Sequence, residues 1–119
     1  MVIQRFEDII AWQKAQNYAV DIYAAFNNLK DYGFKDQIIR AVVSISNNIA
    51  EGFDRGSSAE FARFINISMA SCSETKSMLY LAGRLGYLSK EQQILLIEQS
   101  EEIAKILRGL LKAIKTNSK

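Results

Sequence analysis

The sequence contains no histidine, no proline and only one cysteine among its 119 residues. Without histidine, the chain lacks the most common general base and the most common metal ligand of proteins. The single cysteine, Cys72, excludes an internal disulfide and cannot complete a zinc site of cysteine and histidine ligands. The six glycines are dispersed, and none lies in a phosphate-binding loop motif. We therefore expect no catalytic, metal or cofactor site, and so a protein that is not an enzyme.

The absence of proline favours long helices, because proline breaks helix interiors and marks loops. Hydrophobic residues make up 49% of the chain and charged residues 24%, which is typical of a folded domain, here a single domain over residues 1–119. The longest apolar run, residues 94–97, is far shorter than the roughly 20 residues that cross a membrane. The N-terminal segment also lacks the apolar core of a signal peptide. We expect a cytoplasmic protein with no membrane partner.

Apolar residues recur at intervals of three and four in four segments, as on the buried faces of amphipathic helices. Ser57 with Glu60, and Ser89 with Gln92, match capping boxes that would begin the third and fourth helices. Gly33 would end the first helix. The short links force consecutive helices to be antiparallel neighbours. We predict an all-α fold, an antiparallel up-down-up-down four-helix bundle, with helices at about residues 6–29, 36–54, 58–85 and 90–115.

The second segment carries a stripe of polar residues where better helix formers would be expected. Folding this helix back on the third about residue 56 places Ser44 opposite Ser68 and Arg40 near Glu74. One interpretation is a hydrogen-bonded seam that fixes the register of two helices, with Arg40 paired to Glu74. The other is a polar ligand or partner site between the helices. The residues of this polar seam are Gln37, Arg40, Ser44, Asn48, Glu51, Arg55, Ser68 and Glu74.

The C-terminal segment carries five cations at intervals of three and four, and no acidic residue follows Glu102. Such a stripe could contact the phosphates of RNA or DNA. Alternatively, it complements the helix dipole and keeps the bundle soluble. The net charge of only +2 does not decide between these interpretations. The residues of this basic stripe are Lys105, Arg108, Lys112, Lys115 and Lys119.

The third segment has a second apolar stripe, offset from the first. One four-helix core has room for about one apolar stripe per helix, and an exposed apolar patch usually marks an interface. We therefore expect a homo-oligomer that buries this second stripe between subunits. Its residues are Phe64, Ile67, Met78, Leu81 and Leu85.

The second segment also carries a family resemblance. Residues 37–41 (Gln-Ile-Ile-Arg-Ala) and 48–52 (Asn-Ile-Ala-Glu-Gly) resemble the signature of the bacterial 23S rRNA intervening-sequence proteins, also labelled S23 ribosomal proteins. Residues 11–15, 57–64 and 83–88 fit the same family, whereas Ser46 stands where the family usually has proline. The resemblance implies a four-helix bundle. The accessory protein of diversity-generating retroelements, a related branch, is a strongly basic pentamer that works with a reverse transcriptase and nucleic acid.

Together, the residues and the resemblance predict a non-enzymatic, homo-oligomeric four-helix bundle. The expected partners are further copies of the chain, five in all by the resemblance, and RNA or DNA. The alternative is a structural or protein-interaction module that docks another protein and binds no nucleic acid.

Overall fold

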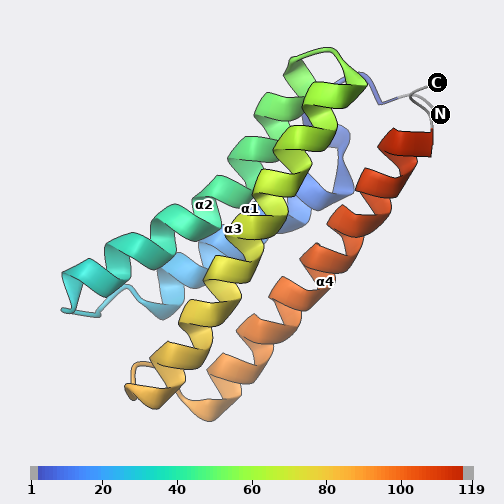
Figure 1. The fold of residues 1–119 in the computed structure, drawn as a ribbon. Helices are drawn as coiled ribbons and strands as arrows, with labels where there is room; N and C mark the ends of the chain where they lie inside the picture. Colours follow the sequence, from blue (N-terminus) through green and yellow to red (C-terminus); the bar gives the residue numbers. More distant parts are fainter. Residues whose placement is uncertain (1–2, 117–119) are drawn as a thin grey trace.

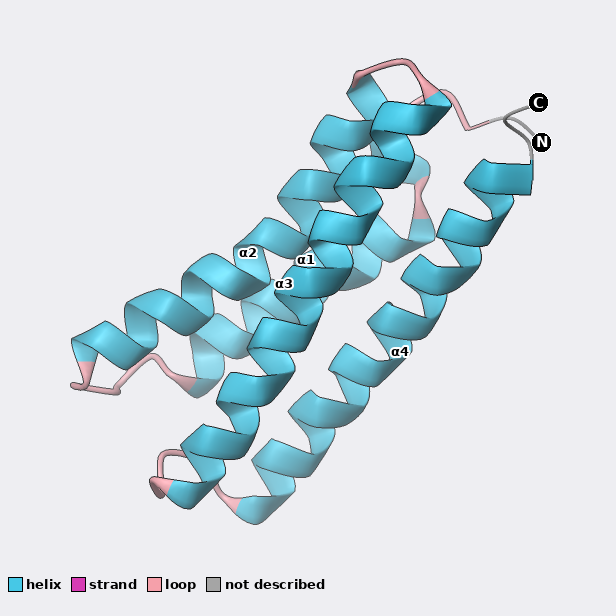
Figure 2. Ribbon diagram, in the orientation of Figure 1, coloured by secondary structure: helices cyan, strands magenta, loops and turns pink. Residues whose placement is uncertain are grey.

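The computed structural model describes residues 3–116 as four long helices after one short turn (Figure 1). The described part of the chain contains no strand (Figure 2). Each helix packs against the next, and α4 also packs against α1, so the four helices close a ring. This is the predicted antiparallel up-down-up-down bundle. The elements are the 3-10 turn η1 (Phe6–Asp8), α1 (Ile10–Ala25), α2 (Tyr32–Asp54), α3 (Ser58–Arg84) and α4 (Lys90–Thr116).

The link between α1 and α2 differs from the prediction. Helix α1 is shorter at both ends than the expected 6–29, and α2 begins four residues before the expected 36. The reason is the cap at Asp31, whose Oδ1 accepts a hydrogen bond from the Phe34 amide at 3.2 Å. Gly33 therefore lies inside α2 instead of ending α1. The glycines with positive φ are Gly56 and Gly86, in the two later links.

The two predicted capping boxes form to different extents. At the start of α4, the Gln92 amide donates to Ser89 Oγ and the Ser89 amide donates to Gln92 Oε1, both at 3.1 Å. At the start of α3, the Glu60 amide donates to Ser57 Oγ at 3.2 Å. The Glu60 carboxylate instead accepts from Arg63 Nε at 3.0 Å. The serine caps thus fix where both helices begin.

The core runs along the axis of the bundle and takes residues from all four helices. In the second helix, the apolar residues that recur at intervals of three and four are buried at Ile38, Val42, Ile45 and Ile49. At the end formed by the α1–α2 and α3–α4 links, Phe34 packs against Phe26 and Tyr87, with ring centroids 5.8 and 5.3 Å away. None of the described helices combines the length and the apolarity needed to cross a membrane.

Candidate functional site

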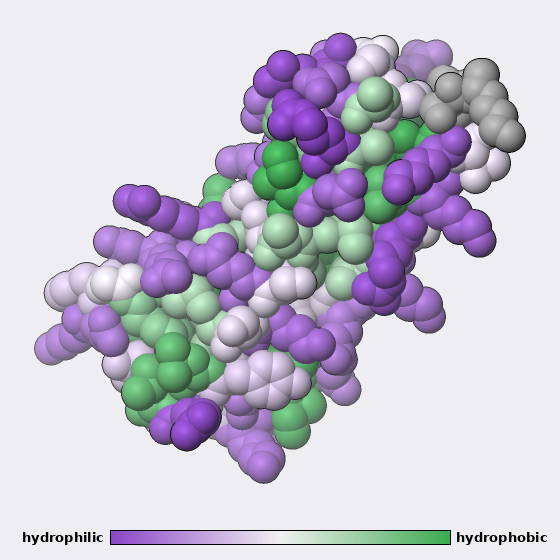
Figure 3. Space-filling view, viewed as in Figure 1, coloured by the Kyte–Doolittle hydropathy of each residue, from purple (hydrophilic) through white to green (hydrophobic). Residues whose placement is uncertain are grey.

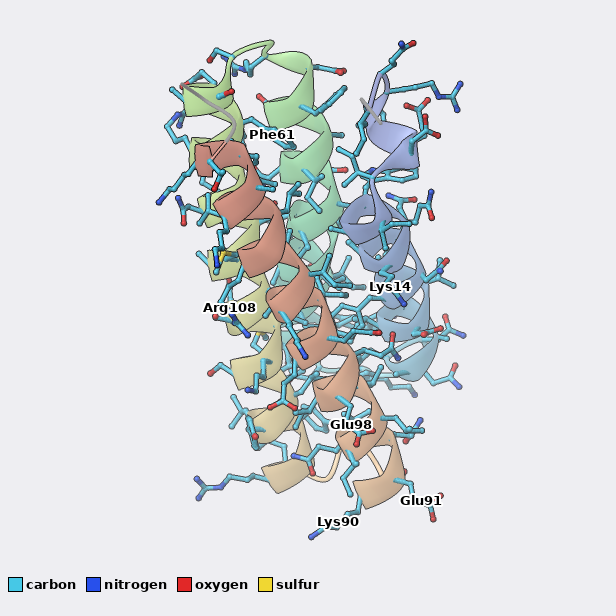
Figure 4. The ribbon with its side chains drawn as sticks, turned by 90° about the vertical axis from the view of Figure 1, so that its right-hand side faces the viewer. Lys14, Phe61, Lys90, Glu91, Glu98 and Arg108 are labelled. Carbon is cyan, nitrogen blue, oxygen red and sulfur yellow. The ribbon has the colours of Figure 1, made fainter. Side chains whose placement is uncertain are left out.

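The basic stripe lies on the exposed side of the C-terminal half of α4. Lys105, Arg108, Lys112 and Lys115 are all exposed, and Lys119 lies outside the described residues. No carboxylate of residues 3–116 is within ion-pair distance of Lys105, Arg108 or Lys112. Arg108 is labelled on the upper half of α4 in Figure 4. These three side chains are therefore available to an anionic partner.

Arg108 also borders the groove between α3 and α4. One hollow of about 300 Å³ there is lined by residues including Arg108, Lys76 and Glu101. A second hollow, of about 490 Å³, lies along α4 and is lined by Arg108, Leu111, Lys112, Lys115 and Thr116. Lys76 is a cation at this groove that the sequence did not reveal, because its position depends on how α3 lies against α4. Its Nζ is 3.0 Å from Glu101 Oε2, and this contact raises the pKa of Lys76.

The chemistry of this face suits phosphate oxygens more than bases. Lysine and arginine side chains bind phosphate by charge-assisted hydrogen bonds. Stacking on bases needs aromatic side chains, and residues 90–116 contain none. Within residues 3–116, no three acidic or cysteine side chains converge as metal ligands would.

The polar seam lies between α2 and α3. Ser71 Oγ donates to Ser44 Oγ at 2.9 Å, and Asn48 Nδ2 donates to the Ser44 carbonyl and hydroxyl, each at 2.8 Å. The buried Ser68 hydroxyl donates to the Ile45 carbonyl at 2.9 Å. Ser44 therefore faces Ser71, whereas the sequence placed it opposite Ser68. These bonds occupy the Ser44 hydroxyl and join the two helices directly.

The two ends of the seam carry its charged residues. Glu74 Oε2 accepts a 3.4 Å hydrogen bond from Gln37 Nε2. The predicted pair of Arg40 with Glu74 does not form: Arg40 is exposed and has no ion pair within residues 3–116. At the other end, Arg55 pairs with Glu51 at 3.0 Å and reaches Glu60 of α3 at 3.7 Å. These hydrogen bonds and ion pairs hold α2 against α3 along most of the polar seam.

The second apolar stripe of α3 is divided between the core and the surface. Phe64 and Met78 are only 6% and 8% exposed, so these two residues cannot belong to a surface interface as predicted. Arg55 and Arg63 lie over the Phe64 ring, 5.0 and 4.6 Å from its centroid. The other three residues of the stripe, Ile67, Leu81 and Leu85, are exposed.

Exposed apolar side chains gather at one end of the bundle. Leu81 and Leu85 lie near the end of α3, and Ile94 and Leu95 lie near the start of α4. Figure 3 shows apolar patches at this lower end, over the end of α3 and the start of α4. We call this set of four residues the apolar end.

Cys72 is buried and structural. Its Sγ donates to the Ser100 carbonyl at 3.2 Å, and burial raises the pKa of the thiol to about 11. The neighbouring Tyr18 hydroxyl has no hydrogen-bond partner among the described residues, and burial raises its pKa as well. A neutral thiol is a poor nucleophile, so nothing here favours cysteine chemistry.

The comparisons with known proteins agree with this architecture. The family model of the 23S rRNA-intervening sequence protein matches residues 7–109. A solved structure from Bacteroides thetaiotaomicron, described as a protein with unknown function from the S23 ribosomal protein family, is 30% identical. The similarity covers 87% of this chain and 96% of that one, with a TM-score of 0.81. Among curated proteins, none matches. The chain belongs to the 23S rRNA-intervening sequence protein family.

Proposed function

We propose that this protein is a non-enzymatic binding module whose α4 contacts the phosphate backbone of RNA or DNA. The observation that carries this proposal is the set of three exposed cations without an ion-pair partner, Lys105, Arg108 and Lys112. No acidic residue follows Glu102 to oppose them. A complement to the helix dipole would need cations only in the last turn, whereas Lys105 lies about three turns before the end of α4.

The spacing of these cations also fits a nucleic-acid strand. Lys105 and Lys112 are separated by about 10 Å along the helix axis, at about 1.5 Å per residue. A DNA strand carries one phosphate per roughly 3.4 Å of axis. The stripe therefore spans about three phosphates. If the three cations neutralise three phosphates, the affinity for duplex DNA should fall about 40-fold between ~50 and ~200 mM salt, because binding releases the counterions of those phosphates.

The test is a salt titration of binding to labelled RNA and duplex DNA of arbitrary sequence. The variant Lys105→Gln/Arg108→Gln/Lys112→Gln should lose the binding and its salt dependence. The matched control, Lys30→Gln/Arg40→Gln/Arg84→Gln, removes three exposed cations elsewhere and should bind nearly as the parent does. No binding by the parent at ~50 mM salt, or equal loss in both variants, contradicts the proposal.

The apolar end favours a second candidate function, a homo-oligomeric scaffold. Leu81 is 47% exposed, Leu85 49%, Ile94 48% and Leu95 60%. Exposed apolar patches usually mark an interface. A closed ring would bury this surface on every copy, and the resemblance to the retroelement accessory protein makes a pentamer the assembly to expect.

Light-scattering mass tests this assembly at micromolar concentration. Leu81→Glu/Leu85→Glu should dissociate it, because each new charge would be buried without a partner. Ile10→Glu/Val20→Glu alters two exposed apolar residues outside both the apolar end and the second apolar stripe, and serves as the control. A parent of about 13 kDa that also binds no nucleic acid would favour the alternative, a module that docks another protein.

A further inference from the structure

The outer face of α4 carries a charge pattern that spans the whole helix. Glu91, Glu98, Lys105 and Lys112 follow one another at intervals of seven residues, so they lie on one face, with a drift of only about 20° per interval. All four are exposed, and none makes an ion pair with any residue of 3–116. We call these four residues the charge stripe. Its first half is acidic and its second half is basic.

Interactions within the subunit do not account for this pattern. Helix dipole effects are confined to the first and last turns, so they could explain Glu91. They do not explain Glu98 or Lys105, each more than two turns from both ends of α4. The core does not explain the stripe either, because it contacts the opposite face, through Leu96, Ile103 and other buried residues.

We propose that the charge stripe binds the same stripe of a second copy of this chain, with the two α4 helices antiparallel. A two-fold axis between residues 101 and 102 brings Glu91 opposite Lys112 of the second copy and Glu98 opposite Lys105. Symmetry repeats both contacts, so every charge of the stripe meets its opposite. A parallel arrangement would set acid against acid and base against base. The contact is isologous and closes on itself as a dimer.

The residues nearest the axis are compatible with this approach. Glu101 and Glu102 of both copies would meet there, and like charges would repel. Each is already paired within its own subunit: Glu101 Oε2 lies 3.0 Å from Lys76 Nζ, and Glu102 Oε2 lies 3.4 Å from Lys14 Nζ. These two lysines belong to α3 and α1, on either side of α4. They neutralise the centre of the interface.

The position of Gly109 supports the same antiparallel register of the two α4 helices. Gly109 lies in the interior of α4, where glycine weakens a helix relative to alanine. A Cβ at this position would meet no atom within 4 Å, so nothing inside the subunit requires glycine there. Under the two-fold axis, Gly109 faces Ile94 of the second copy, an apolar side chain that is 48% exposed. The missing side chain gives Ile94 room to approach.

The pairing of two α4 helices should depend more strongly on salt than an assembly held by the apolar end. Exposed ion pairs are individually weak, and screening shortens from about 30 Å at ~10 mM salt to about 8 Å at ~150 mM. The contact should therefore form at low salt and high protein concentration and disappear at higher salt. An assembly held by Leu81 and Leu85 would persist.

The test uses two variants that make the stripe a single sign. Glu91→Lys/Glu98→Lys has four cations on the stripe, and Lys105→Glu/Lys112→Glu has four acids. Their net charges become +6 and −2, because two reversals shift the parent value of +2 by four units in either direction. The matched controls, Asp36→Lys/Asp54→Lys and Lys30→Glu/Arg40→Glu, carry the same net charges but leave the stripe intact. Circular dichroism checks that each variant is folded.

Sedimentation at ~10 mM salt, without nucleic acid, then measures the association of each variant alone and of the mixed pairs of variants. The two stripe variants should each associate about tenfold more weakly than the parent and regain the association when mixed. Mixing the two controls should give no gain beyond that of the parent. A parent that does not associate at low salt, or an equal gain in the control mixture, overturns the proposal. Phosphate binding is tested separately, since Glu91→Lys/Glu98→Lys keeps Lys105, Arg108 and Lys112.

Discussion

Replacing Gly52 with alanine would test how closely α2 and α3 pack. Gly52 is buried and has an ordinary helical φ, so backbone conformation does not require glycine there. The constraint is space. An added Cβ would collide with Phe64 Cβ and lie 3.2 Å from Phe64 Cγ and 3.4 Å from Phe61 Cδ1. A Cβ is fixed to the backbone, so α3 itself would have to move.

The magnitude follows from two opposing effects. Alanine strengthens a helix interior by about 1 kcal/mol relative to glycine. Overpacking in a well-packed interface costs about 1–3 kcal/mol, and the rigid collision with Phe64 places Gly52→Ala toward the upper end of this range. The net loss in the free energy of unfolding is about 1–2 kcal/mol. For a chain of this length, the midpoint of thermal unfolding should fall by about 4–8 °C.

Gly109→Ala is the matched control, because the same substitution on α4 meets open space. It should stabilise the protein by about 0.5–1 kcal/mol and raise the thermal midpoint. Thermal and urea unfolding, followed by far-ultraviolet circular dichroism, measure both effects. The measurement should be made at moderate salt and low concentration, where α4 pairing does not contribute. If both substitutions stabilise the protein equally, the close approach of Gly52 to Phe64 is refuted.

Two further substitutions test polar groups of the bundle. Tyr18→Phe removes a buried hydroxyl that has no hydrogen-bond partner among the described residues, so urea unfolding should show no loss of stability and a gain of up to about 1 kcal/mol. Two hydrogen bonds lower the pKa of Asp31: the larger effect comes from the Tyr87 hydroxyl, which donates to it at 2.6 Å, and the smaller from the Phe34 amide at the start of α2. The contribution of the Asp31 carboxylate to folding stability is present above its unfolded pKa of about 3.8. This contribution is lost as the pH falls through the lower pKa of the folded state. Asp31→Asn should therefore lose less stability than the parent between about pH 5 and 2; an equal loss would show that this carboxylate contributes nothing.

The sequence predicted the bundle well because its signals are local. The spacing of Ile38, Val42, Ile45 and Ile49 requires no knowledge of the partner helices, and all four are fully buried. The link after α1 was predicted less well because apolar spacing continues through Phe26 into a turn. An apolar side chain in a turn can be buried as readily as one in a helix, so periodicity alone did not mark the end of α1.

The candidate sites were harder to predict because they depend on how helices meet. Each helix of a closed ring contacts two neighbours, so α3 buries a face wider than one stripe, and Phe64 and Met78 fall inside it. The partner of Glu74 depended on the register between α2 and α3. The structure selects Gln37, about one turn from the predicted Arg40. The exposed cations from Lys105 to Lys115 could be predicted as one stripe because they lie on a single helix.

The two proposals for α4 use the same lysines, so the two contacts would compete with each other. Pairing of two copies through the charge stripe would cover Lys105 and Lys112, which are two of the three cations proposed to contact phosphates. A subunit paired in this way could not use them for nucleic acid at the same time. Both contacts weaken with salt, so salt alone cannot favour one strongly over the other. A high protein concentration favours pairing over phosphate binding, because pairing needs a second copy of the chain while phosphate binding does not. Adding nucleic acid should therefore separate paired copies, and reversing Glu91 and Glu98 should strengthen binding to nucleic acid by removing this competitor and adding positive charge.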